Sequence, residues 1–117
     1  MLLLTSPSDQ VQIITDTAAS IDVHASWVDI TPSTSAIAAS RLNTIITTAA
    51  TTSVAGSPPA STQRNVKALH VRNKHATQTC QVTIQLFDGS VVTPLYVAPL
   101  APGNMLEMTD FGGIRRA

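Results

Sequence analysis

Residues 20–29 read SIDVHASWVD, and this stretch decides the fold class. Polar and apolar residues alternate strictly along it from Ser20 to Trp27. The apolar set is Ile21, Val23, Ala25 and Trp27, and the polar set between them is Asp22, His24 and Ser26. A period of two residues places successive side chains on opposite faces of a β-strand. The stretch is therefore predicted to be a strand with one buried face.

Further strands are predicted on both sides of this one. Residues 9–14 (DQVQII) alternate in the same way, and residues 65–73 (NVKALHVRN), 79–87 (TCQVTIQLF) and 90–100 (SVVTPLYVAPL) are rich in β-branched and apolar residues. A last strand is expected around residues 105–108. Asp88-Gly89 favours a tight type I′ hairpin turn, and Pro102-Gly103 suits the centre of a type II turn. Pro94 indicates an edge strand or a bulge.

These short strands, joined by glycine and proline turns and without a convincing helix, predict an all-β protein. We expect a single domain over residues 1–117, with a β-sandwich or jelly-roll-like fold. Residues 31–63 are dominated by Thr, Ser and Ala and have no firm period. They are expected to be a loop or an extended arm laid on a neighbour, with an edge strand flanked by long loops as the alternative. Residues 109–117 are expected to be a tail.

Composition limits the classes of function. The chain has 117 residues, a net charge of zero and only 12% charged residues. Nucleic-acid binding requires a basic patch, so it is not expected. One cysteine cannot form an internal disulfide, and the short apolar start suits neither a signal peptide nor a membrane span. A charge-poor surface indicates coverage by other subunits, or else solvation by Ser, Thr, Asn and Gln.

A metal site is the first chemistry to consider, because His70, His75 and Cys80 follow one another with a spacing of five residues. If residues 66–73 and 79–87 formed an antiparallel hairpin, uniting their apolar faces would pair Val71 with Cys80. His70 would then point to the opposite face, and His75 would lie in the turn. Zinc sites need three or four converging ligands, so we expect no metal and no cofactor.

A hydrolytic triad is the second possibility, because Asp22, His24 and Ser26 lie on one face of one strand. Residues two apart on a strand are separated by about 6.6 Å along its axis. A triad needs hydrogen bonds of about 2.6–3.2 Å, usually between separate elements. We therefore expect a polar outer face without catalytic residues, and a protein that is not an enzyme. Trp27 shares the apolar face, which favours core packing over a sugar-stacking platform.

Three stretches resemble small structural proteins of tailed bacteriophages. They are DVHASWVD (residues 22–29), NTIITTAATTSV with TQRNVKALHVRNK (residues 43–54 and 62–74), and VTIQLFDGS followed by LAPGNMLEMTD (residues 82–90 and 100–110). The resemblance implies a virion component with a β-sandwich or jelly-roll fold. It supplies no catalytic residues.

The resemblance leads to an expected function. We expect a decoration or cement protein that stabilises a capsid by bridging its subunits, with the major capsid protein or other virion proteins as partners. It would be made in the host cytoplasm, form a homodimer or homotrimer, and bind neither nucleic acid nor membrane. The alternatives are a neck, tail or fibre-associated binding module that recognises a glycan, and a small hydrolase that uses the face of Asp22.

Overall fold

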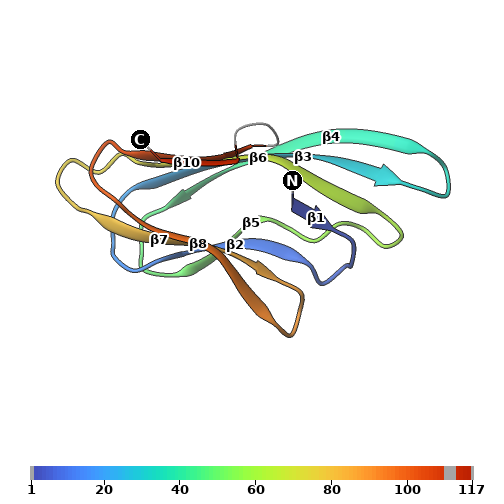
Figure 1. Cartoon of the computed structure of the whole chain (residues 1–117), viewed down its shortest axis with the longest axis horizontal. Helices are drawn as coiled ribbons and strands as arrows, with labels where there is room; N and C mark the ends of the chain where they lie inside the picture. Colours follow the sequence, from blue (N-terminus) through green and yellow to red (C-terminus); the bar gives the residue numbers. More distant parts are fainter. Residues whose placement is uncertain (1, 110–112, 117) are drawn as a thin grey trace.

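The regular structure of this protein is entirely β-strand, in a computed structural model that describes residues 2–109 and 113–116. In chain order the strands are β1 (Leu2–Leu4), β2 (Gln10–Thr15), β3 (Ile21–Thr31), β4 (Ala36–Ile46), β5 (Thr51–Ala55), β6 (Gln63–Asn73), β7 (Cys80–Phe87), β8 (Val92–Leu100), β9 (Met105–Thr109) and β10 (Gly113–Arg116). They form two antiparallel sheets that lie one above the other (Figure 1). The predicted all-β sandwich is confirmed.

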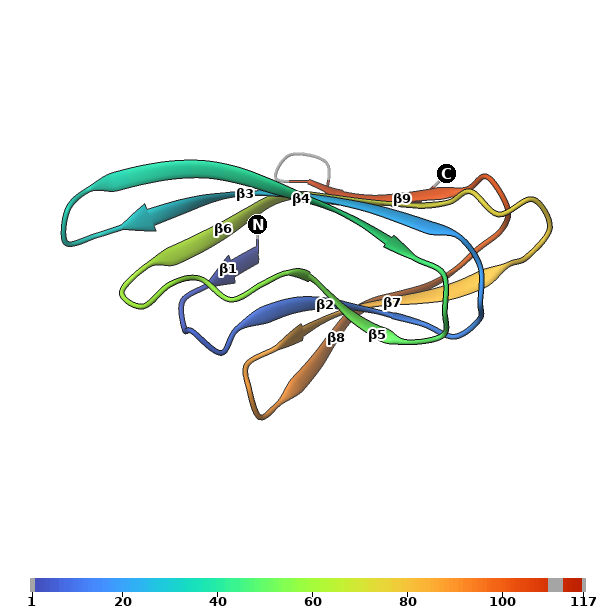
Figure 2. The same cartoon turned by 180° about the vertical axis from the view of Figure 1, so that it is seen from behind.

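The chain builds the sandwich from two long hairpins, each folded over so that its halves lie in opposite sheets. In the first, β3 and β4 belong to the six-stranded sheet and β2 and β5 to the four-stranded sheet. In the second, β6 and β9 belong to the six-stranded sheet and β7 and β8 to the four-stranded sheet (Figure 2). Pairing of β3 with β6 and of β2 with β7 joins the two hairpins. The strand orders are therefore β10-β9-β6-β3-β4, with β1 also beside β6, and β5-β2-β7-β8.

The core lies between the sheets and is formed by the alternating apolar positions. In β3 the four predicted apolar residues are buried, and the polar ones between them are partly exposed. The largest fully buried side chains are Leu4, Ile13, Ile21, Leu69, Ile84, Leu100 and Leu106. Trp27 is also buried, as predicted. Aliphatic residues from both inner faces thus supply most of the burial that stabilises the fold.

The hairpin supposed above between residues 66–73 and 79–87 does not form. β6 and β7 lie in different sheets, and residues 74–79 cross between them. The buried Asn73 side chain closes this end of the sandwich. Its amide nitrogen donates to the carbonyl oxygens of Gln78 (2.8 Å) and Leu100 (2.9 Å), and its oxygen accepts from the His75 backbone N–H (3.0 Å). These hydrogen bonds fix residues 74–79, the segment in which the chain passes from one sheet to the other.

Residues 31–63 are not mainly a loop or an extended arm, because most of them are strand. The alternative, an edge strand flanked by loops, is closer to the structure. β4 is an edge of the six-stranded sheet and β5 an edge of the four-stranded sheet. Ile46, Val54 and Ala55 are part of the core, which ties this segment to the sandwich. The expected tail is also partly strand, since β10 pairs with β9. Residues 110–112 and 117 of the expected tail lie outside the described residues.

The two predicted turns have different outcomes. Asn104 N–H donates to the Ala101 carbonyl (3.0 Å) and Gly103 has φ +84°, so Pro102-Gly103 forms the predicted type II turn. The loop at Asp88 is longer than predicted, because Phe87 pairs with Val92 and four residues lie between them. The Asp88 carboxylate accepts hydrogen bonds from the backbones of Ser90 (3.0 Å) and Val91 (2.7 Å). An Asx-type loop replaces the type I′ turn.

Candidate functional site

The three candidate metal ligands do not converge. His70 lies on the outer face of β6, whereas the Cys80 side chain is buried between the sheets, where burial raises the pKa of its thiol. His75 lies in the crossing segment, and its Nδ1 accepts the backbone N–H groups of Thr77 (3.1 Å) and Gln78 (3.0 Å). No group of three or more His, Cys, Asp or Glu residues suitable for a metal is present among the described residues.

The polar residues of β3 do not assemble into a triad. Asp22, His24 and Ser26 all point to the outer face, as the alternation predicted. Asp22 forms an ion pair with Lys74 (3.0 Å), and His24 Nδ1 contacts the Asn43 side-chain oxygen on β4. Because both the acid and the imidazole are bound to other partners, no relay leads to Ser26.

A shallow groove of about 450 Å³ covers this outer face. Its floor is formed by a direct cross-strand pair, His24 and His70, with Asn43 on one side. Asp22, Arg72 and Lys74 line one end. The pairing of His24 with His70 could not be predicted, because alternation alone does not set the register between β3 and β6. The groove offers hydrogen-bond donors and acceptors, but no activated nucleophile.

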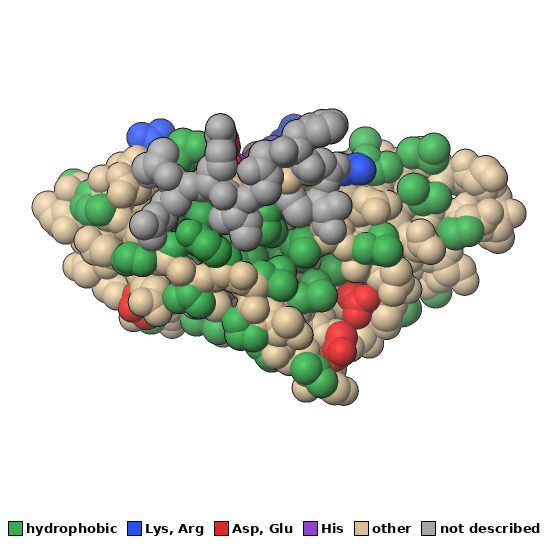
Figure 3. Space-filling model, viewed as in Figure 1, with side chains coloured by type: hydrophobic (Ala, Val, Ile, Leu, Met, Phe, Trp, Pro, Cys, Tyr) green, Lys and Arg blue, Asp and Glu red, His purple; other side chains and the backbone are tan. Residues whose placement is uncertain are grey.

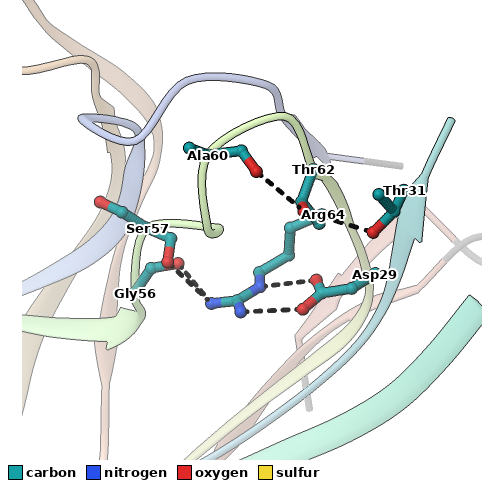
Figure 4. A network of polar contacts seen from close by, with 7 residues as sticks. All are labelled: Asp29, Thr31, Gly56, Ser57, Ala60, Thr62 and Arg64. Carbon is teal, nitrogen blue, oxygen red and sulfur yellow. Dashed lines mark hydrogen bonds and ion pairs between the residues drawn. The ribbon is translucent and has the colours of Figure 1, made fainter. Parts of the chain in front are cut away.

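A network around Arg64 stiffens the part of the six-stranded sheet near the β3–β4 turn (Figure 4). The guanidinium binds both carboxylate oxygens of Asp29 (2.8 and 3.0 Å) and donates to the Gly56 carbonyl (2.8 Å). It also lies 4.6 Å from the centre of the Trp27 ring. Bidentate and cation–π contacts of this kind fix geometry when the charge is largely buried, as it is here. No motif or spacing in the sequence indicates this network, whose ion pair joins residues 35 positions apart.

The outer faces of the two sheets differ in charge. The six-stranded sheet carries charged residues on β3, β4, β6, β9 and β10, whereas no charged residue lies within β2, β5, β7 or β8. The outer face of the four-stranded sheet is formed instead by glutamine, threonine and apolar residues. A hydrogen bond from Gln85 to Gln12 (2.8 Å) crosses it. The centres of protein–protein interfaces are likewise depleted of charged residues.

Exposed apolar side chains extend this face to the edge strand β8. They are Val91, Val92, Leu95 and Val97. Figure 3 views the sandwich from one edge. Lys and Arg lie along its upper margin, over the six-stranded sheet, and hydrophobic side chains are spread over the lower part among other residues and a few Asp or Glu. We call the outer face of the four-stranded sheet, together with these four residues, the apolar face. It carries four of the eight exposed large apolar side chains among the described residues, and its strands contain no charged residue.

The second exposed edge is β4. Residues 36–43 are exposed on both faces of the strand, and Ile37 and Ile45 remain 72% and 65% exposed. Among the described strands, β4 pairs only with β3, so its outer backbone edge has no partner. A free strand edge with apolar side chains readily pairs with another chain.

Comparison with known proteins gives no match to any family, curated protein or solved structure. The part of the chain that the structure describes contains no helix able to cross a membrane.

Proposed function

We propose that this chain is a structural component of a bacteriophage virion, a decoration or cement protein that binds the capsid and bridges its subunits. The observation that carries the proposal is the apolar face, a sheet whose strands contain no charged residue and whose edge strand β8 exposes apolar side chains. A surface without charges and with exposed apolar side chains is suited to burial against another protein.

The remaining geometry supports a structural role in preference to catalysis. The candidate metal ligands diverge, and the acid and imidazole of β3 are bound to other groups. The polar groove on the opposite sheet lies away from the apolar face, which leaves it available to solvent when the apolar face is covered. A β-sandwich can bridge two capsid subunits without any conformational change.

Placement on the neck, tail or fibre uses the same apolar face and is the alternative. A glycan-binding module in that position normally offers exposed aromatic rings. Trp27 is buried beneath Arg64, and Phe87 and Tyr96 are only partly exposed, so the described residues offer little of this kind.

Co-sedimentation with particles tests the proposal. Capsids encoded by the same genome, purified without this chain, are mixed with the wild-type protein, Val97→Lys or Leu3→Lys. Val97 lies on the apolar face and Leu3 on the six-stranded sheet, and they are matched at 50% and 49% exposure. We expect wild type and Leu3→Lys to sediment with capsids and Val97→Lys to remain in solution. Failure of the wild type to bind capsids would refute cement function, and equal binding of both variants would refute the role of the apolar face.

A further inference from the structure

The edge strand β4 lacks most of the devices that usually protect a sheet edge, and Arg41 is its single charged residue. Natural edges are short, bulged, or interrupted by proline or lysine. β4 has eleven residues, contains no proline or lysine, and pairs with β3 over its whole length without a register shift.

The other edges of this sandwich are protected. β5 is only five residues long, and its pairing with β2 contains a register shift. β8 carries Pro94 and Pro99 and is bulged near Pro94. β10 has four residues, two of which are arginines. β4 is therefore the described edge that is best able to accept another strand.

We propose that β4 pairs with β4 of a second copy of this chain in an antiparallel register centred on Leu42. This joins the two six-stranded sheets into one continuous sheet across a twofold axis. Directly opposed residues of antiparallel strands share a face, so the two copies of Leu42 would contact each other at the axis. Ala39 would lie opposite Ile45 of the second copy, which covers much of that exposed side chain.

Charge selects this register over its neighbour. Arg41 is the only charged residue of β4. A register centred on Arg41 would oppose two like charges, which destabilises a strand pair. Centring the pair on Leu42 places Arg41 opposite Asn43, a neutral hydrogen-bonding partner. Only Leu42, which is 42% exposed, is then opposed to its own copy.

The partner proposed for the free edge of β4 is a second copy of this chain, because β4 can pair with itself around a twofold axis. The twofold contact is closed and uses one surface twice, so it ends at a dimer and does not form a fibre. An axis perpendicular to the sheet keeps both four-stranded sheets on the same side. The dimer thus presents two apolar faces in one direction. If the proposed function holds, two weak contacts per dimer would combine into firm bridging of the capsid.

Disulfide trapping tests the register. In Leu42→Cys the two new thiols would face each other at the axis, within the Cα separation of about 4.4–6.8 Å that a disulfide requires. Ile37→Cys is the matched control, because its two copies would lie ten residues apart along the pair, about 34 Å. The native Cys80 is buried and does not interfere. We expect mild oxidation to link Leu42→Cys into a dimer and to leave Ile37→Cys unlinked. Equal linking of both variants, or of neither, would overturn the register.

Solution mass tests the dimer itself, without any virus particle. The wild type should be a dimer by light scattering, and Leu42→Lys should weaken association about tenfold or more by opposing two charges. Leu95→Lys on β8 is the control and should remain dimeric. A monomeric wild type, or a dimer unaffected by Leu42→Lys, would refute the inference. Because this assay contains no capsid, its outcome is independent of the particle-binding test.

Discussion

Asn73 is the residue whose removal tests the architecture most sharply. It is fully buried at the end of β6, where the chain leaves one sheet for the other. Its side chain makes three hydrogen bonds to backbone groups at Gln78, Leu100 and His75. Substitution with alanine leaves two carbonyl oxygens and one N–H group without these partners.

The expected loss follows from the number of bonds. Each hydrogen bond contributes about 0.5–1.5 kcal/mol net, and a buried group left without a partner costs more. Three bonds therefore correspond to about 3 kcal/mol. A urea m-value of about 2 kcal/mol/M converts this loss into a fall of about 1.5 M in the midpoint of unfolding.

Urea unfolding followed by Trp27 fluorescence measures this change, with all variants compared at one protein concentration because association shifts apparent stability. Asn65→Ala is the matched control. Asn65 makes no side-chain hydrogen bond to the residues that the structure describes, and its loss should change stability by less than about 0.5 kcal/mol. If Asn73→Ala lost less than about 1 kcal/mol, the reasoning that the crossing depends on this side chain would be refuted.

Three further outcomes are expected. Arg64→Lys loses the bidentate contact and should lower the free energy of unfolding by about 2 kcal/mol in urea; no loss would contradict the assigned network. Gly89→Ala should destabilise by about 1–3 kcal/mol in the same assay, because Gly89 has φ +97° and a Cβ would lie 2.8 Å from Ser8; unchanged stability would contradict this loop geometry. Backbone hydrogen bonds from Val91 and Ser90 lower the pKa of Asp88 below its usual 3.8 in the folded state. The ionised carboxylate therefore stabilises the fold above that value, and this contribution is lost as pH falls through the folded pKa. The stability advantage of wild type over Asp88→Asn should shrink between about pH 5 and pH 2, and a constant difference would refute the assignment.

The strand pattern was predictable wherever one face of a strand is buried. β2, β3 and β7 alternate because their inner positions face the core, so β3 could be recognised from residues 20–29 alone. The type II turn was predictable because proline fixes φ at the first central position, Pro102, and glycine tolerates the positive φ of the second, Gly103.

β4 could not be recognised, because nine of its eleven residues are exposed and they include residues on both faces of the strand. Without burial there is no selection for alternation, and the strand exists through its long-range pairing with β3. β10 has only four residues, too few to show an alternation of apolar and polar residues.

The sequence also did not show which strand each strand pairs with. A short polar segment after a strand can turn back within a sheet or cross to the other one. Here Asn73 and His75 hold the crossing through backbone hydrogen bonds, and nothing in the alternation of residues 65–73 and 79–87 distinguishes the two cases. The pair formed by His24 and His70 could not be predicted for the same reason, because the register between β3 and β6 was unknown. The prediction that His70, His75 and Cys80 point apart was correct, although it assumed a hairpin that does not form.

Image reconstruction of the intact virus particle tests the central claim most directly, namely that the uncharged sheet is built to lie against other subunits. We expect density for this sandwich on the particle, with β2, β5, β7 and β8 facing the capsid and the groove of His24 and His70 facing solvent. Particles whose reconstruction and protein content both lack this chain, or a sandwich bound through its six-stranded sheet, would contradict the account.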